Sequence, residues 1–582
     1  MKRSRQPNPQ QAATPARFQR RIYLLAGLLS LAAVTLAGVA VRLQVVDHAQ
    51  LTSRGDARSM RVVSTVAYRG KITDRYDNSL AVSAPVESLW VNPADLQGHD
   101  GQLRLLARRL GVNGGELVRR VHDNGEREFL YLARGLDPAE AARVRALNIE
   151  GVNFTTEYRR FYPASDVTSH LLGFTNIDDI GAEGVEMSFD HELAGEAGLK
   201  RVIQDRRGRK VEDVESIRAV EQGRDLALSL DLRIQYLAYR ELKSALIENR
   251  ARAGSVVLLD IQSGEVLAMV SLPAFNPNVR DKGDADMRRN RAVTDQFEPG
   301  SSIKPFILAA ALASGRYTAD SVIDTGDGYL QVGSKRFTDE HKIGRAPLAL
   351  AIAKSSNVAM AMIALSLEPR HLWQTLTNLG FGVSSNVPLP AEASGSLAGY
   401  SHWRSINIAT MSHGYGLSVT PLQLARAYAT IGGYGIRRPV SVTRVDAPVA
   451  GQRVLDEATC RALIGLLEAV TGAEGTGTRA RIPGYRVAGK TGTAWKAVGG
   501  GYSRDRYVAT FAGVVPATNP RLAAVVMIDE PSAGKYYGGE VAAPVFSAVL
   551  GGALRLMAIA PDDIGSEVER DLARSTVQVA QR

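Results

Sequence analysis

An uninterrupted run of twenty uncharged residues, Ile22 to Val41, is the feature that most restricts how this chain can fold. A helix rises 1.5 Å per residue, so a run of this length spans about 30 Å, the thickness of the hydrocarbon core of a bilayer. A cleaved signal peptide is the alternative, and the small residues at 37–40 leave it open, but its apolar region usually has only about 7–15 residues. We therefore expect an uncleaved membrane-spanning helix at 22–41.

The charges before this run predict its orientation. Residues 1–21 contain six basic side chains and no acidic one: Lys2, Arg3, Arg5, Arg17, Arg20 and Arg21. Positive charge is retained on the cytoplasmic side of a membrane, so 1–21 is predicted to be a cytoplasmic tail. No comparable apolar run follows, and residues 43–582 are therefore expected on the other side.

Charge and cysteine content exclude some classes of function. The net charge is +10, but the first 21 residues supply six of these charges, which leaves +4 for the rest of the chain. So small an excess gives little support to nucleic-acid binding. The single cysteine, Cys460, excludes an intramolecular disulfide and any cysteine-rich metal site.

The portion outside the membrane divides into two expected domains. Residues 42–222 are mixed, charged and rich in turns, and we interpret them as a folded non-catalytic domain, in which 103–146 is predicted to be largely helical. Residues 223–560 form the second domain, and the polar residues 561–582 are expected to be a tail.

The second domain combines strands at both ends with helices between them. Residues 255–260 and 265–270 predict a β-hairpin, after an amphipathic helix that begins at Leu232. Helical patterns dominate 301–435, and strand patterns return at 486–494, 507–515 and 522–529. This order indicates an α+β fold in which one sheet, built from both ends of the domain, is covered by helices.

The chemistry is predicted to centre on a serine that is activated by lysine. Ser-x-x-Lys places both side chains on one face of a helix, and it occurs at Ser301–Lys304 and at Ser532–Lys535. Pro305 is best tolerated in a first helical turn, so a helix should begin near Ser301, where free N–H groups favour negative charge. Ser532 lies in a loop-like segment, and Ser301 is therefore the better candidate.

Two further motifs strengthen this assignment. Lys490-Thr491-Gly492 occurs once, on a predicted strand, where the glycine would let a substrate backbone lie close. Ser-x-Asn occurs three times, beginning at Ser355, Ser384 and Ser405. Ser355 directly precedes a helical run, Ser384 lies in a loop-like segment, and no clear helix start is expected at Ser405. We therefore assign the motif to Ser355 and Asn357.

In this order and context, the motifs resemble those of the class B penicillin-binding proteins, in particular the peptidoglycan D,D-transpeptidases of cell division. The resemblance extends over nearly the whole chain and includes the segments 69–75, 297–305, 354–357, 414–425, 490–493 and 533–539. It implies an antiparallel sheet covered by helices, as in serine β-lactamases, behind an elongated dimerisation-type domain and one membrane helix.

The resemblance also implies roles for individual residues. Ser301 would attack the bond between the two terminal D-alanines of a stem peptide, and Lys304 would take its proton, with a pKa lowered by burial and by the charge of Lys490. Ser355 would relay a proton to the leaving amine and Asn357 would hold the donor amide. The substrate-binding set implied by the family is Thr491, Gly492, Thr493 and Ser302, and the backbone N–H groups of residues 301 and 493 would form the oxyanion hole.

The family further implies a location and partners. These are the inner membrane with a periplasmic catalytic domain, the division septum, peptidoglycan stem peptides, β-lactam antibiotics, and division proteins including a membrane glycan polymerase of the FtsW type. No cofactor or metal is implied. The alternatives are an elongation-type transpeptidase, a β-lactamase, and a β-lactam sensor or silent scaffold.

Overall fold

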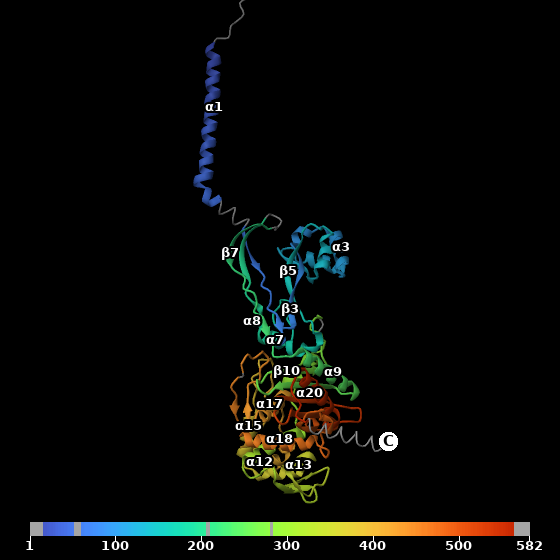
Figure 1. The fold of residues 1–582 in the computed structure, drawn as a ribbon. Coiled ribbons are helices and arrows are strands. Elements are labelled where there is room, and N and C mark those ends of the chain that lie inside the picture. Colours follow the sequence, from blue (N-terminus) through green and yellow to red (C-terminus); the bar gives the residue numbers. More distant parts are fainter. Residues whose placement is uncertain (1–14, 52–59, 205–209, 280–282, 448, 564–582) are drawn as a thin grey trace, which may run out of the picture. The chain divides into compact units, whose positions relative to one another are not determined.

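The computed structural model describes residues 15–51, 60–204, 210–279, 283–447 and 449–563 (Figure 1). By its contacts the chain divides into two compact units. The first comprises 1–67 and 196–221, and the second comprises 68–195 and 222–582. This division by contacts places residues 68–195 with the C-terminal part of the chain, whereas the sequence predicts a domain boundary at 222. The predicted domain ranges stay a prediction.

The first unit contains the predicted membrane helix and a small sheet. α1 (Pro15–Val41) continues into a π-helical turn at Arg42–Val46. Residues 18–46 have a mean hydropathy of 2.3 and bury nothing, so by length and composition this helix can cross a membrane. β1 (Met60–Thr65), β6 (Gly198–Gln204) and β7 (Lys210–Arg218) form an antiparallel sheet in the order β1-β6-β7.

The second unit begins with a sheet around β3 (Ser79–Val91). β3 pairs with β2 (Ile72–Thr73), β4 (Leu130–Leu136) and β5 (Val152–Phe161), and β2 pairs with β8 (Leu226–Ala227). The helices of this region are α3 (Asp100–Leu110), α4 (Gly114–His122), α5 (Pro138–Arg145), α6 (Ser169–Leu172), α7 (Gly184–Ser188) and α8 (Asp190–Ala194).

The expectation that 103–146 is largely helical was wrong over β4. This strand lies between α4 and α5 and pairs with β3, so that Leu89 lies opposite Ala133. Leu130 and Leu132 both point into the core, with the two-residue period of a strand. Because helical patterns lie on both sides of this short period, the sequence does not separate it from a helix. Pairing with a distant strand decided the structure of this segment.

A five-stranded antiparallel sheet forms the centre of the region expected to be the second domain. Its order is β10-β9-β19-β18-β17, with bounds Val266–Leu272, Ala253–Asp260, Leu522–Asp529, Gly501–Val515 and Ala488–Val498. The predicted hairpin and the three predicted C-terminal strands are all present. Successive residues of β9 enter two different cores, because Val257 packs in one hydrophobic cluster and Val256 in the other.

Helices cover both faces of this sheet (Figure 1). α9 (Leu232–Glu248) and α20 (Ala543–Leu556) pack on one face, and α17 (Pro421–Gly432) packs against β9 and β19 on the other. The remaining helices are α10 (Ala285–Arg288), α11 (Arg291–Thr294), α12 (Lys304–Ala313), α13 (Leu348–Ala353), α14 (Asn357–Ser366), α15 (Pro369–Leu379), α16 (Ser405–Met411), α18 (Glu457–Thr471) and α19 (Gly538–Val541).

Short strand pairs interrupt the region expected to be helical. They are β11 (Val322–Asp324) with β14 (Arg345–Pro347), and β12 (Tyr329–Val332) with β13 (Lys335–Thr338). A further pair joins β15 (Ile436–Arg437) to β16 (Gln452–Arg453). Most of the expected C-terminal tail lies outside the described residues.

Candidate active site

Ser301 lies in a tight turn that leads into α12. The turn, Gly300–Ile303, is 3-10 helical, and α12 begins at Lys304 with Pro305 in its first turn. The predicted helix start is therefore preceded by one tighter turn. Ser301 is half-buried, and its hydroxyl makes no hydrogen bond within the described part of the chain. A serine placed in this way is available to a substrate.

Lys304 is fully buried, and its amine is surrounded by oxygen atoms. Nζ lies 2.5 Å from the carbonyl oxygen of Ser355, 3.1 Å from Ser355 Oγ and 2.8 Å from Asn357 Oδ1. Burial lowers the pKa of Lys304 to about 7, against the opposing effect of the carboxylates of Asp339 and Glu340. The lowered pKa makes the neutral amine accessible near pH 7, which suits a general base.

The start of α14 presents Ser355 and Asn357 to this amine. Ser355 has a φ of +58°, in the left-handed region, which turns the chain just before the helix. Asp339 holds the start of α14 in place. Its Oδ1 accepts the N–H of Asn357 at 2.6 Å and that of Val358 at 2.9 Å. Its Oδ2 accepts the Ser356 hydroxyl at 2.6 Å. Sequence reasoning missed Asp339, because a single aspartate at a strand end belongs to no motif.

The structure brings Ser355, and not the other two Ser-x-Asn serines, to Lys304. Ser384 bonds to Glu392 in a loop, as expected. The expectation that no helix begins at Ser405 was wrong, because α16 starts there. Asn407 Oδ1 accepts the N–H of Arg404 at 3.0 Å and so caps the helix from inside, and arginine at the cap position gave no recognisable signal.

Ser532, the alternative nucleophile, lies in the loop between β19 and α19. Its hydroxyl donates to the carbonyl of Arg250 at 2.8 Å, and its backbone N–H donates to Asn249. The prediction of a loop at this second Ser-x-x-Lys is confirmed. A serine held by two backbone carbonyls is suited to a structural role.

β17 carries the Lys-Thr-Gly motif at the edge of the central sheet. Lys490 is fully buried, and its Nζ donates to the hydroxyl and to the carbonyl of Thr491, both at 3.1 Å. Burial, and then the charge of Lys304, lower the pKa of Lys490. The charge of Lys304 therefore lowers the pKa of Lys490, and not the reverse as expected. The pKa of Lys304 is lowered by burial. Thr493 Oγ accepts the N–H of Gly538 at 3.1 Å.

Gly492 and Ser302 hold the nucleophile turn against β17. A Cβ atom on Gly492 would lie 2.8 Å from the Pro299 carbonyl oxygen and 3.0 Å from Ser302 Oγ. The glycine is thus required by close packing inside the protein, a reason different from the substrate approach expected above. Ser302 is fully buried, and its hydroxyl donates to the Pro299 carbonyl at 2.6 Å.

Two glycine-rich segments that accompanied the core motifs in the sequence also contact the site. Gly414, with φ +89°, approaches the nucleophile turn so closely that a Cβ atom would lie 2.0 Å from the carbonyl oxygen of Gly300. A Cβ on Gly538 would lie 2.4 Å from the carbonyl oxygen of Gly492. Both segments therefore shape the backbone around Ser301 and β17.

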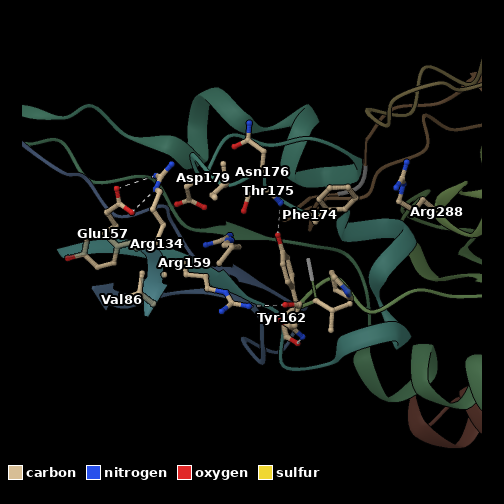
Figure 2. A pocket seen from close by; sticks show the side chains of 17 residues that line it. Val86, Arg134, Glu157, Arg159, Tyr162, Phe174, Thr175, Asn176, Asp179 and Arg288 are labelled. Carbon is tan, nitrogen blue, oxygen red and sulfur yellow. Dashed lines mark hydrogen bonds and ion pairs between the residues drawn. The ribbon is translucent and has the colours of Figure 1, made fainter. Parts of the chain in front are cut away.

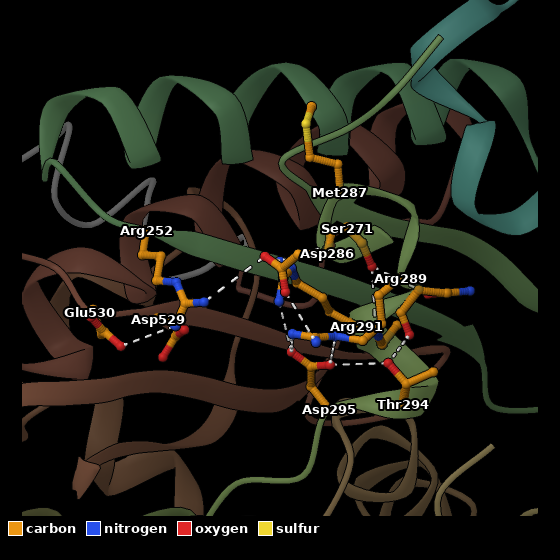
Figure 3. A network of polar contacts seen from close by, with 12 residues as sticks. Arg252, Ser271, Asp286, Met287, Arg289, Arg291, Thr294, Asp295, Asp529 and Glu530 are labelled. Atoms are coloured by element: carbon orange, nitrogen blue, oxygen red, sulfur yellow. Dashed lines mark hydrogen bonds and ion pairs between the residues drawn. The ribbon is translucent and has the colours of Figure 1, made fainter. Parts of the chain in front are cut away.

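Ion pairs fix the segment that leads into the nucleophile turn (Figure 3). Arg291, which is 2% exposed, pairs with Asp286 at 2.7 Å and with Asp295 at 3.0 Å. Arg252 pairs with Glu530 at 3.4 Å at the end of the central sheet. A buried arginine that lost its partners would be costly, so α10 and α11 are held in one arrangement before Ser301.

Comparison with known families matches two parts of the chain. The Penicillin binding protein transpeptidase domain matches residues 254–551, and the Penicillin-binding Protein dimerisation domain matches residues 64–228. The first match contains all of the candidate catalytic residues.

Individual relatives match over nearly the full length. The Peptidoglycan D,D-transpeptidase FtsI of Escherichia coli K12 is 43% identical over 547 residues, covering 93% of this chain and 92% of its own. The Probable peptidoglycan D,D-transpeptidase PbpC of Pseudomonas aeruginosa is 39% identical, covering 94% and 97%. The transpeptidase domain of Burkholderia pseudomallei penicillin-binding protein 3 is 40% identical with a TM-score of 0.54, covering 58% of this chain and 97% of that domain.

Proposed function

Because the chain belongs to the class B penicillin-binding proteins of the cell-division type, which are peptidoglycan D,D-transpeptidases, we propose that Ser301, Lys304 and Ser355 carry out its acyl transfer. One observation carries this assignment. The amine of Lys304, one turn after Ser301, is fully buried and lies 3.1 Å from Ser355 Oγ and 2.8 Å from Asn357 Oδ1.

The first step forms an acyl-enzyme. Neutral Lys304 takes the proton of the Ser301 hydroxyl while Oγ attacks the carbonyl between the two terminal D-alanines. The backbone N–H groups of Ser301 and Thr493 stabilise the oxyanion, a contribution of about 3–4 kcal/mol per donor. The peptide bond then breaks, the proton passes through Ser355 to the leaving amine, and D-alanine departs.

The second step forms the cross-link. An amine of a neighbouring stem peptide attacks the ester carbonyl and loses a proton to Lys304, and Ser301 Oγ leaves and recovers a proton. One peptide bond is broken and one is made, so no cofactor is needed. A β-lactam enters the same first step, but its ring-opened product retains the leaving group and blocks the second.

Three residues of β17 are proposed to hold the donor peptide. The pKa of Lys490 is lowered in the free protein, and a terminal carboxylate arriving beside its amine would favour the ammonium form. Thr491 and Thr493 supply hydroxyls to the same carboxylate, and Asn357 holds the donor amide. Gly492 and Ser302 act as positioning residues, since both face protein atoms at the nucleophile turn.

The proposed location is the inner membrane at the division septum, with the catalytic part in the periplasm. Support comes from the apolar helix at 18–46 and from the basic residues before it. The proposed partners are membrane proteins of the division complex, including a glycan polymerase of the FtsW type, and these rest on family membership.

The test is labelling of the full chain with a fluorescent penicillin, in the wild type, in Ser301→Ala and in Ser532→Ala. A stable adduct that is lost in Ser301→Ala alone supports the proposal. Labelling that survives Ser301→Ala overturns the nucleophile assignment. Rapid release of hydrolysed penicillin in place of a stable adduct would indicate a β-lactamase.

A further inference from the structure

A pocket of about 360 Å³ lies in the second unit, and none of its lining residues belongs to the candidate active site (Figure 2). It is lined by β4 and β5, by the loop 174–179 and by residues 277–279. Its size is within the range of pockets that bind small ligands. We propose that this pocket binds a short peptide that carries a carboxylate, a function beyond the transpeptidase reaction.

The charges of the pocket favour an anionic group. Its charged lining residues are Arg134, Arg159, Arg160, Arg288, Glu157 and Asp179. Three of the four arginines have a carboxylate within 3.4 Å. Arg159 is exposed, and its guanidinium donates to the backbone carbonyl of Asn278 at 2.9 Å; in the described ranges it has no ionic partner. It can therefore bind a ligand carboxylate without breaking an existing ion pair.

Two buried polar atoms in the lining residues match a peptide group. Arg160 Nη2 and Asp179 Oδ1 are both buried without a hydrogen-bond partner among the residues that the structure describes. A buried polar atom without a partner destabilises the protein, so a ligand that satisfies it is favoured. Burial raises the pKa of Asp179 to about 6, which leaves it ionised and accepting at pH 7.5. Once these side chains turn toward a bound ligand, a peptide group supplies both the carbonyl that Arg160 lacks and the N–H that Asp179 lacks.

Apolar and aromatic side chains also line the pocket, beside the polar Thr175 and Asn176. Val86, Tyr162 and Phe174 line the pocket together with the charged residues (Figure 2), and Ile177 also belongs to the lining. They favour aliphatic side chains beside the carboxylate. Peptides of this kind come from two sources, an acidic segment of a protein partner or the stem peptide of peptidoglycan, and the experiment below separates them.

Binding is tested with the full chain in detergent, after acylation by penicillin so that the catalytic site is blocked. The probes are Val-Glu-Val-Ala, the same peptide with Gln in place of Glu, and a muramyl tripeptide, each labelled with fluorescein, and binding is followed by fluorescence anisotropy. We expect saturable binding of an acidic probe and at least tenfold weaker binding of the Gln peptide. Binding of the linear peptide indicates a protein source, and binding of the muramyl tripeptide alone indicates the stem peptide.

The variants are Arg159→Glu and the matched control Arg143→Glu, an exposed arginine on α5 that likewise donates to a backbone carbonyl. Arg159→Glu should weaken binding at least tenfold and gain affinity for a peptide with Lys in place of Glu, whereas Arg143→Glu should change neither. Arg159→Gln serves if the Glu variant does not fold. The proposal is overturned if no acidic probe binds saturably below about 5 mM, if the Glu and Gln peptides bind equally, or if both variants weaken binding alike.

Discussion

Lys304 and Lys490 are two lysines with no solvent exposure in one site. Burial disfavours the ammonium form of each, and the charge of Lys304 lowers the pKa of Lys490 further. The two lysines are therefore proposed to have different roles. In the proposed mechanism Lys304, with a pKa of about 7, acts as the base at physiological pH, and Lys490 becomes a cation when an anionic substrate arrives beside it.

The pKa of Lys304 predicts the pH dependence of acylation. The neutral amine is the active form, so the rate should rise with pH, pass half its maximum near pH 7 and reach a plateau above about pH 8. At pH 6 we expect roughly a tenth of the plateau. The measurement is the second-order rate of penicillin acylation between pH 5.5 and 9. A rate that is constant from pH 6 to pH 8 would exclude Lys304 as the base.

Gly492→Ala should damage the site through packing alone. The new Cβ would lie 2.3 Å from Thr510 Oγ1 and 2.8 Å from the Pro299 carbonyl oxygen, so the nucleophile turn must move. We expect acylation to slow by about 10–100-fold, because displacement of about 1 Å has effects of this size, and stability to fall by about 1–3 kcal/mol.

The matched control is Gly501→Ala on β18, where a Cβ would meet no atom within 4 Å. It should leave both the acylation rate and the melting temperature near those of the wild type. Normal acylation in Gly492→Ala would show that the turn tolerates the added methyl group.

At the scale of elements, α14 depends on a carboxylate outside it. Asp339 accepts two backbone N–H groups at its start, and it raises the pKa of Lys304. Asp339→Ala should destabilise the chain by about 1–3 kcal/mol, because these donors lose their acceptor. Acylation should slow, and the midpoint of its pH profile should move to lower pH, since the removed charge held the pKa of Lys304 up.

Asp327→Ala is the control for this prediction, since Asp327 is an exposed aspartate in the turn before β12. It should change neither stability nor the pH midpoint. A midpoint that stays in place in Asp339→Ala, with stability reduced, would restrict Asp339 to a structural role.

The elements that sequence predicted well are those whose pattern is local. The hairpin at 255–270, the second half of β18 and β19 have long apolar runs, and the three core motifs have fixed spacings on a strand or at helix starts. β4 could not be separated from its helical neighbours, because only its pairing with β3 distinguishes it. Asp339 was beyond prediction for a related reason: its role depends on where β13 ends relative to α14, and spacing along the chain does not encode that.

At the scale of the whole molecule, the helix at 18–46 and the catalytic residues belong to different compact units. A chain that begins at residue 47 should therefore leave the membrane fraction and still be acylated by penicillin, at a rate within about threefold of the full chain. Fractionation followed by penicillin labelling checks this. If the shortened chain remained with the membrane, a second region of attachment would be required, and if it lost labelling, the anchor would be necessary for the fold of the site.

The pairing of β9 with β19 has a consequence for synthesis. Asp260 lies opposite Leu522. The sheet therefore cannot be completed until β19 has been synthesised, about 260 residues after β9. Until then the emerging chain exposes an apolar hairpin with an unpaired edge, a form prone to aggregation. The nascent chain is therefore exposed to aggregation throughout this interval, and the site around Ser301 is complete only after Lys490 and the last strands have been synthesised.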